Sequence, residues 1–467
     1  MKRFASVIMA IAVILPFIKC TSSSAINFPI DNPIHSESAI VLNLDNDVVI
    51  HEQNADLKQM PGPLVNIMTA IICLESNSNL SQELTVDNSV YTYLVNTQFP
   101  EDLRSGDIRN GDVLTINDLL YAMMLTSSYE ASMVLADHFG DGDIEAFVEK
   151  MNAKASAIGC TDTHFTNPTG LYDEDQYTTA RDMAIITKYA LKSSVFVSIA
   201  TEWSYKPSVP NLENHPDPSK WIWTHSNTMM DEENSKYYYR GVKGIKTGNL
   251  SAAGRNIVVM ASKDGNNYLA VLLKAPISDA DGDTQFYHLD DAKTVFDWVF
   301  NHFSYKDIVT ASEEIAEVPV ELADGNDFVL LKPASEYTAL WYDSIETSLI
   351  KKEIQYDSDI KAPVKAGDKL GVLHLMYSGE EIASIDLVAV SDVERSASKF
   401  NIYVAKRFKN SQWFGKAFLI SGILCLIYIL LCFYSFICFK NRSKPVKPVY
   451  AMPNVSKKKK SNRKNNE

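Results

Sequence analysis

The chain has 467 residues and a mass of 52.2 kDa, with 46% hydrophobic and 22% charged residues. That length predicts two or three domains, and this much apolar sequence excludes a mostly disordered or collagen-like protein. The first 25 residues carry a net charge of +3 and the last 28 carry +9, so the segment between them carries −26 and the whole chain −14. So acidic a segment repels phosphate groups, which excludes nucleic acid as its main partner.

The N-terminus has the pattern of a secretory signal peptide. Lys2 and Arg3 precede an apolar run that extends to Ile18, and small residues follow as far as Ala25. A charged start, a short apolar core and a small-residue exit are typical of signals removed on export. We therefore predict a signal peptide over residues 1–25.

Strand and helix patterns alternate over the next part of the chain, which we expect to form one domain over residues 26–304. The stretch 39–51 predicts two strands joined by an Asp-Asn-Asp turn. Apolar periodicity and alternation predict the remaining elements. We expect helices over 64–74, 116–139, 143–158 and 179–191, strands over 255–262 and 268–274, and a last helix with Phe296, Val299 and Phe300 on one face.

From about Lys306 short β-rich runs separated by turn residues predict an all-β domain over residues 305–395, followed by a connector over 396–416. Residues 417–439 hold no charge and are long enough to cross a bilayer, so we predict a transmembrane helix there. The basic tail at 440–467 should stay cytoplasmic. We therefore predict a single-pass protein of the cell membrane with an extracytoplasmic body.

Cysteine and histidine spacing gives no sign of a metal site. Cys73 and Cys160 are the cysteines of the exported body, and they are either one disulfide or two buried thiols. The histidines have no metal-ligand spacing, and no Gly-rich phosphate loop occurs. We expect neither a metal nor a cofactor.

Four segments resemble the serine-type D-alanyl-D-alanine carboxypeptidases, the low-molecular-mass penicillin-binding proteins. Their order and spacing also fit that family over roughly residues 38–300. The segments are SAIVLNLDNDVVIHEQNADLKQMPGPLVNIMTAIICLE (38–75), LLYAMMLTSSYEASMVLADHFGD (119–141), GCTDTHFTNPTGL (159–171) and GVKGIKTGNLSAAGRN (241–256). The resemblance implies an α/β transpeptidase domain like that of penicillin-binding proteins and β-lactamases, an antiparallel sheet flanked by helices, with a small all-β C-terminal domain and one transmembrane helix.

The family's chemistry uses three motifs, of which the third is intact here. A Ser-x-x-Lys supplies the nucleophile and a base, a Ser-x-Asn assists proton transfer, and a Lys-Thr-Gly on an edge strand engages the substrate carboxylate. The resemblance places the third motif at Lys246, Thr247 and Gly248. It implies that these three residues bind substrate.

The first motif is broken twice. In PGPLVNIMTA (61–70) the flanking residues place Pro63 at the nucleophile position and Asn66 at the lysine position. Proline has no hydroxyl to form an acyl-enzyme, and asparagine has no titratable proton, so it is not a base. Proline suits the first turn of a helix, so we expect the helix to be kept and the chemistry lost.

The second motif is half kept. Ser127 matches the family serine and is a candidate substrate-binding residue, while Tyr129 replaces the asparagine and should alter or partly fill the cleft. Ser127 is a weak nucleophile without an adjacent base, and Lys246 is the candidate that the motifs offer. Thr224-His225-Ser226-Asn227 matches a family segment beside the cleft, which we interpret as structural or weakly substrate-contacting.

Three hypotheses follow. The first is a catalytically inactive, membrane-anchored homologue that binds peptidoglycan stem peptides ending in D-Ala-D-Ala, or a cell-wall or division partner. The alternative is an active serine-type carboxypeptidase that trims pentapeptides with a non-standard nucleophile such as Ser127. The third is a structural interaction module whose cleft is irrelevant.

Overall fold

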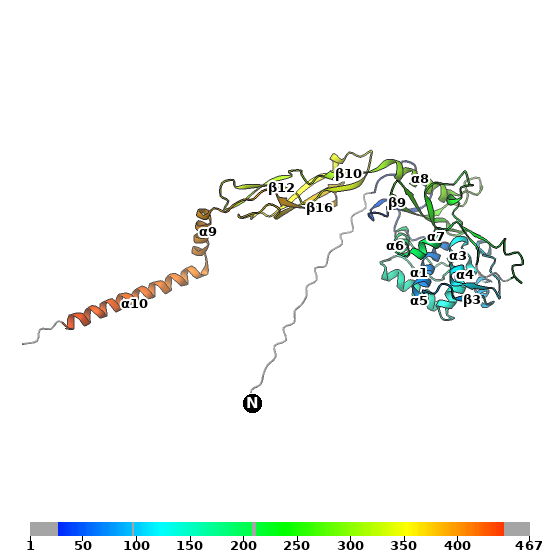
Figure 1. The fold of residues 1–467 in the computed structure, drawn as a ribbon, viewed down its shortest axis with the longest axis horizontal. Helices are drawn as coiled ribbons and strands as arrows, with labels where there is room; N and C mark the ends of the chain where they lie inside the picture. Colours follow the sequence, from blue (N-terminus) through cyan, green and yellow to red (C-terminus); the bar gives the residue numbers. More distant parts are fainter. Residues whose placement is uncertain (1–26, 96–97, 208–211, 443–467) are drawn as a thin grey trace, which may run out of the picture. The chain divides into compact units, whose positions relative to one another are not determined.

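A five-stranded antiparallel sheet forms the centre of the body in the computed structural model, which describes residues 27–95, 98–207 and 212–442 (Figure 1). The strand order is β2-β1-β9-β8-β7, so β7, which carries Lys-Thr-Gly, lies at an edge. Most residues of the middle strands are buried because helices cover both faces of the sheet. The strands are β1 (Ser38–Asn43), β2 (Val49–Gln53), β7 (Val242–Leu250), β8 (Gly254–Lys263) and β9 (Asn266–Ala275).

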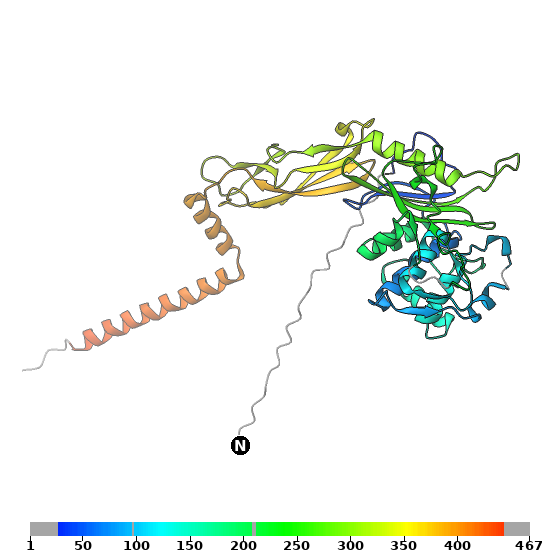
Figure 2. The same ribbon diagram turned by 45° about the vertical axis from the view of Figure 1, so that its right-hand side comes forward.

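One helix packs on one face of this sheet and most of the others lie on the opposite face (Figures 1 and 2). The single helix is α8 (Tyr287–His302), whose Phe296 and Val299 are buried as the apolar pattern predicts. The other face is covered by α1 (Asn66–Ser76), α3 (Ile116–Thr126), α4 (Tyr129–Phe139), α5 (Ile144–Ala157), α6 (Ala180–Ala190) and α7 (Ser194–Ala200). Shorter elements complete the body: α2 (Ser89–Val95), β3 (Glu83–Thr85), β4 (Val113–Thr115), β5 (Ser204–Tyr205), β6 (Trp223–Thr224), η1 (Gly62–Val65), η2 (Pro100–Asp102) and η3 (Thr228–Met230).

The prediction of one continuous helix over 116–139 is wrong. Ser127 has φ +60° and ends α3 in the left-handed conformation, so the chain turns before α4 begins. Ser128 then caps α4, because its hydroxyl accepts a hydrogen bond from the Ala131 N–H at 3.2 Å. Apolar residues recur with helical spacing in both helices, and only the two adjacent serines between the helices mark the turn.

The C-terminal part of the chain is all-β until residue 389, as predicted. Strands β10 (Phe303–Val309) and β13 (Tyr337–Tyr342) form an antiparallel ribbon. A five-stranded sheet has the order β11-β12-β16-β15-β14, with β11 (Ala316–Pro319), β12 (Phe328–Pro333), β14 (Lys351–Tyr356), β15 (Lys369–Tyr377) and β16 (Glu380–Ala389), and η4 (Thr347–Leu349) precedes β14.

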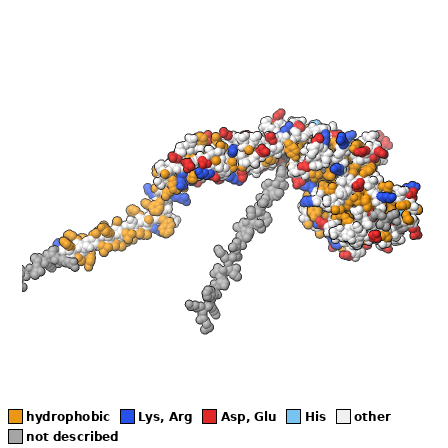
Figure 3. Space-filling model, viewed as in Figure 1, with side chains coloured by type: hydrophobic (Ala, Val, Ile, Leu, Met, Phe, Trp, Pro, Cys, Tyr) orange, Lys and Arg blue, Asp and Glu red, His pale blue; other side chains and the backbone are white. Residues whose placement is uncertain are grey.

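Two helices follow this sheet. The connector over 396–416 contains α9 (Ala397–Lys409). The last helix, α10 (Gln412–Arg442), contains the predicted transmembrane stretch and exposes apolar side chains along its length (Figure 3). Its 29 residues from Gln412 to Lys440 are long and apolar enough to span a membrane. The predicted signal peptide (1–25) and nearly all of the basic tail lie outside the described residues.

Cys73 and Cys160 are both free thiols in the structure, so of the two alternatives the disulfide is not formed. Cys73 is buried and Cys160 is partly exposed. Burial raises the pKa of both thiols, which makes them poor nucleophiles.

A close backbone contact fixes the start of α1. Gly170 has φ +82°, and a Cβ built on it would lie 2.0 Å from the Gly62 carbonyl oxygen. Gly170→Ala should therefore lower the free energy of unfolding by at least about 3 kcal/mol, because the two backbones must separate.

The matched control is Gly265→Ala, whose φ is +84° but whose Cβ would meet nothing within 4 Å. It should cost only about 1 kcal/mol of backbone strain. Urea unfolding followed by tryptophan fluorescence measures both variants. Equal losses would contradict the proposed contact.

Candidate functional site

The broken first motif forms the start of α1, as the resemblance implies. Pro63 lies in η1, where its missing N–H is not needed, and it is buried. Strand β7 passes close by: a Cβ built on Gly248 would lie 3.4 Å from Pro63 Cδ and 3.3 Å from the Pro61 carbonyl oxygen. The nucleophile position therefore faces the Lys-Thr-Gly strand but presents only a pyrrolidine ring.

Asn66 is fully buried and cross-links three parts of the body. Its Nδ2 donates to Ser132 Oγ at 3.0 Å and to the Pro168 carbonyl oxygen at 3.2 Å. The Pro168 carbonyl oxygen also accepts from Thr69 Oγ1 at 2.9 Å. Its Oδ1 has no hydrogen-bond partner among the described residues, but an amide oxygen is not basic enough to take the proton of a reacting hydroxyl. Asn66 thus holds the helix against its neighbours.

Ser127 and Lys246 are in direct contact. Lys246 Nζ donates to Ser127 Oγ, and also to the Thr247 carbonyl oxygen at 3.3 Å. Lys246 is 0% exposed and Ser127 is 5% exposed. The structure therefore brings together the serine and the candidate base that the motifs offered.

Burial changes the acid–base properties of this pair. It lowers the pKa of Lys246 to about 7, since the charged ammonium loses its water. No carboxylate pairs with Lys246 within the parts of the chain that the structure describes. Burial and the Lys246 charge also lower the pKa of neighbouring His225 to about 3, so His225 is neutral at pH 7. A substantial fraction of Lys246 is then a neutral amine, which can accept a proton.

Tyr129 is buried at the start of α4 and is bound to a separate segment of chain. Its hydroxyl donates to the Asp102 carbonyl oxygen at 2.9 Å, and its N–H donates to the Arg104 carbonyl oxygen. The Asp102 carboxylate in turn accepts from Ser251 N and Oγ. The segment 102–104 therefore joins the second motif to the β7–β8 turn. The hydroxyl of Tyr129 is already engaged there.

The remaining motif residues lie beside the matched Thr-His-Ser-Asn segment. Thr247 Oγ1 and Ser226 Oγ are 2.6 Å apart, and Asn227 Nδ2 donates to the Gly244 carbonyl oxygen at 2.6 Å. Ser226 is exposed although Thr247 and Gly248 are nearly buried. Solvent thus reaches the strand edge at Ser226.

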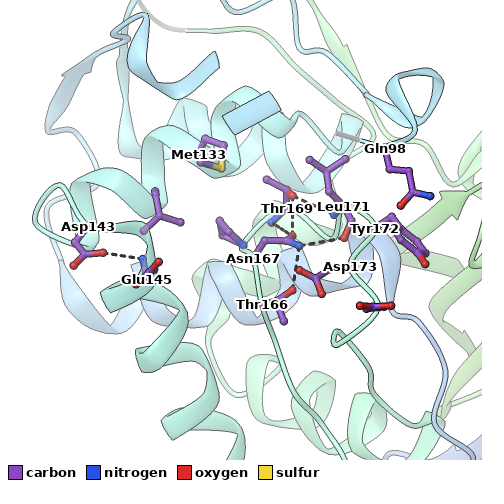
Figure 4. A pocket seen from close by; sticks show the side chains of 13 residues that line it. Gln98, Met133, Asp143, Glu145, Thr166, Asn167, Thr169, Leu171, Tyr172 and Asp173 are labelled. Carbon is purple, nitrogen blue, oxygen red and sulfur yellow. Dashed lines mark hydrogen bonds between the residues drawn. The ribbon is translucent and has the colours of Figure 1, made fainter. Parts of the chain in front are cut away.

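A pocket of about 850 Å³ lies against the same scaffold (Figure 4). The loop 166–174 forms one wall, and residues of α4 and α5 and the turn between them form another. Asp143, Glu145, Asp173 and Glu174 line it, and its lining contains no Lys, Arg or His. It includes none of the seven residues predicted for the site. A group that carries a positive charge suits such a lining.

Several contacts that build the site carry no signal in the sequence. Asp102 and Ser251 are 149 positions apart, and Asn66 and Pro168 are 102 apart. The sequence does not show either pairing, although Asn66, Pro168 and Ser251 lie in segments that match the family, because the contacts depend on how distant segments pack. Sequence reasoning could find the chemistry-bearing positions and could not find what holds them.

Comparisons with known proteins show the family of the chain. The model of the D-alanyl-D-alanine carboxypeptidase family matches residues 24–277, and that of the penicillin-binding protein 5 C-terminal domain matches residues 303–395. The chain belongs to the D-alanyl-D-alanine carboxypeptidase family. This family acts in cell-wall metabolism on peptidoglycan stem peptides. The resemblance inferred from the sequence motifs is confirmed.

The similarity extends over most of the chain. D-alanyl-D-alanine carboxypeptidase DacF of Bacillus subtilis is 26% identical over 364 residues, which cover 77% of this chain and 86% of that protein. DacC of Escherichia coli is 25% identical over 393 residues, covering 82% and 91%.

Solved structures confirm the fold. Penicillin-binding protein 5 of Haemophilus influenzae superposes with a TM-score of 0.54 at 23% identity, covering 79% of this chain and 99% of that one. DacD of Francisella tularensis gives 0.58 at 19% identity, covering 82% and 100%. The predicted fold class, with its C-terminal all-β domain, is therefore correct.

The buried lysine predicts a pH-dependent stability. Its pKa is about 7 in the folded protein against an ordinary 10.5, so the unfolded chain binds more protons between those values. The Lys246 contribution to the free energy of unfolding should therefore rise with pH from 7 to 10, by at most about 1.4 kcal/mol per unit. Lys246→Met should remove this pH dependence of the free energy of unfolding.

The measurement is urea unfolding at pH 6, 8 and 9.5, compared between the wild type and each variant. Lys243→Met, at an exposed position of the same strand, is the control for the loss of a lysine. If the difference between wild type and Lys246→Met is the same at every pH, the lowered pKa is wrong.

Proposed function

We propose that this chain is a catalytically inactive, membrane-anchored member of its family that binds peptidoglycan stem peptides without cleaving them. The observation that carries the proposal is the pair Pro63 and Asn66. Acyl transfer needs an oxygen nucleophile and a base at the start of this helix. Pro63 offers neither a hydroxyl nor an N–H, and the Asn66 amide is held by Ser132 and Pro168.

Retained peptide binding is supported by the state of the third motif. Lys246, Thr247 and Gly248 lie on β7, the edge strand of the sheet. An extended peptide can add to such an edge through main-chain hydrogen bonds. The acidic pocket beside α4 suits an amino group of the same stem peptide. Removing the nucleophile leaves all of these features in place.

Anchoring to a membrane is supported by α10 and by the charges that flank it. A signal peptide over residues 1–25, a span over 417–439 and a basic tail at 440–467 would place the body outside the cytoplasmic membrane and the C-terminus inside. That topology puts the site at the peptidoglycan layer. It also puts the body where a cell-wall or division protein could be its partner instead of a peptide.

A second candidate function is favoured by the contact between Ser127 and Lys246. A serine whose hydroxyl touches a lysine with a pKa of about 7 has the two parts of a nucleophile and base. In that case the chain would be an active carboxypeptidase with a displaced nucleophile. The burial of both side chains argues against it, because a peptide carbonyl must reach Ser127 Oγ.

Labelling with a fluorescent penicillin tests the loss of acylation. We expect no covalent adduct on the wild-type protein, since the position that should attack the β-lactam is Pro63. A matched triple variant, Pro63→Ser, Asn66→Lys and Tyr129→Asn, restores the family residues and should gain labelling if the frame still supports acylation. An adduct on the wild-type body, located by mass spectrometry of peptides, would overturn the proposal.

Release of D-alanine from a pentapeptide separates the two candidates. Under the proposed function, none is released at high protein concentration, and muropeptides ending in D-Ala-D-Ala still bind. Lys246→Ala should weaken that binding about tenfold or more, because it removes a buried positive charge whose field at the strand edge attracts the peptide carboxylate. Release that Ser127→Ala abolishes would instead support the displaced nucleophile.

A further inference from the structure

A groove of about 490 Å³ lies between α9 and the chain segment that joins β11 to β12. Charged side chains line both of its walls: Lys399 and Lys406 come from α9, and Glu321 and Asp327 come from the β11–β12 segment. Apolar side chains, among them Ile402 of α9, complete the lining. A space of this volume is in the range of small-molecule sites.

Hydrogen bonds tie the start of α9 to the other wall of the groove. The Ser396 N–H donates to the Leu322 carbonyl oxygen at 2.8 Å, just before the helix begins. One turn further on, Lys399 Nζ donates to the Ala323 carbonyl oxygen at 2.8 Å. The two walls are therefore held together by contacts to the backbone, so the groove is part of the fold of this domain.

The residues of α9 that line the groove recur with helical spacing. Lys399, Ile402, Tyr403 and Lys406 occupy positions i, i+3, i+4 and i+7, so they share one face of the helix. The sequence from 395 to 442 contains no Asp or Glu, and Lys and Arg side chains gather over α9 (Figure 3). The two walls of the groove therefore carry opposite charges.

Two of the four charged groups in the groove have no partner of their own. The side chains of Lys406 and Asp327 make no ion pair or hydrogen bond in the part of the chain that the structure describes. Glu321, by contrast, has a carboxylate oxygen 3.7 Å from Lys361 Nζ. A cation and a carboxylate that line one groove without pairing suit a ligand that carries both charges.

The groove is close in sequence to the proposed membrane span. Only Asn410 and Ser411 separate α9 from α10, and the ring centroids of Phe408 and Phe414 lie 5.7 Å apart across this junction. Lys406 stands less than two helical turns before the first residue of α10. Once α10 is inserted in a bilayer, lipid headgroups are therefore the charged groups nearest to this end of α9.

We propose that this groove binds the headgroup of a zwitterionic phospholipid of the ethanolamine type. The proposal rests on the membrane anchoring in the proposed function and adds a lipid site to it. Lys406 binds the phosphate, and Asp327 accepts hydrogen bonds from the primary ammonium group. A choline headgroup has no N–H to donate, and an anionic headgroup has no ammonium to offset the repulsion by two carboxylates. The groove therefore distinguishes among these lipids.

The test compares an ethanolamine lipid with a choline lipid, which have the same net charge, so the basic tail does not discriminate between them. Dioctanoyl forms of both are titrated to the full chain in detergent, and bound lipid is counted by native mass spectrometry. The wild type should bind the ethanolamine lipid about fivefold more tightly. Asp327→Asn should remove this preference, and Lys406→Gln should weaken the binding of both lipids.

Matched controls are Asp324→Asn and Lys409→Gln, at exposed positions that do not line the groove. Both should behave as the wild type. Equal affinity of the wild type for the two lipids overturns the proposal. So does a loss of preference in Asp324→Asn as large as that in Asp327→Asn, because the effect would then come from surface charge in general.

Flotation of the full chain with vesicles of pure phosphatidylcholine separates this inference from the proposed anchoring. A chain that does not float contradicts the anchoring, while the titration in detergent still decides the groove. A chain that floats but shows no preference between the lipids keeps its anchoring and loses the headgroup site.

Hydrogen–deuterium exchange locates the bound lipid. Exchange should become slower over residues 319–327 and 396–406 with the ethanolamine lipid, and this change should be absent with the choline lipid and in Lys406→Gln. Dioctanoyl-phosphatidylglycerol is the third lipid. Slower exchange confined to α10, or a larger effect on the groove with phosphatidylglycerol, overturns the proposal.

Discussion

The close packing of η1 between the loop at 168–171 and strand β7 is the constraint on which the site depends. Gly170 meets the Gly62 carbonyl oxygen on one side, and Gly248 meets Pro61 and Pro63 on the other. Asn256 of β8 adds hydrogen bonds from its Nδ2 to the Met60 and Pro61 carbonyl oxygens. These contacts are made by backbone atoms and by small residues. The geometry of the motif therefore survives when its reactive side chains are replaced.

The same constraint explains why Pro63 and Asn66 are tolerated. A proline at the first turn needs no N–H partner, and a neutral amide at the buried position 66 carries no charge that would have to be desolvated. Asn66 instead supplies two donors to a loop that must lie close to the helix. The substitutions remove a nucleophile and a base while they keep the packing that those residues would have required. Fold and family membership thus remain recognisable although two positions of the first motif carry other side chains.

Sequence reasoning predicted the parts of the molecule that are determined locally. The first strand pair, the start of α1 and the family motifs follow from alternation, periodicity and short spacing. The break at Ser127 was missed because apolar periodicity continues through it, and only the two serines signal the turn. The replacement of the family asparagine by Tyr129 predicts an altered or partly filled cleft, and the sequence does not show that the Tyr129 hydroxyl donates to the Asp102 carbonyl oxygen. Such contacts, like that of Arg255 with Phe286, depend on tertiary packing, so no local pattern contains them.

Burying a positive charge has an energetic cost at two positions of the sheet, Lys246 on β7 and Arg255 on β8. Each is a buried cation without a carboxylate among the described residues, and each lowers the pKa of a nearby histidine. Burial of this kind opposes folding, and a protein that only needed to fill the space could use methionine or glutamine. A ligand carboxylate at the edge of β7 would offset the cost at Lys246, and it would raise the pKa of Lys246. Binding would then be accompanied by proton uptake near pH 7, because an amine that is partly neutral in the free protein becomes fully charged in the complex.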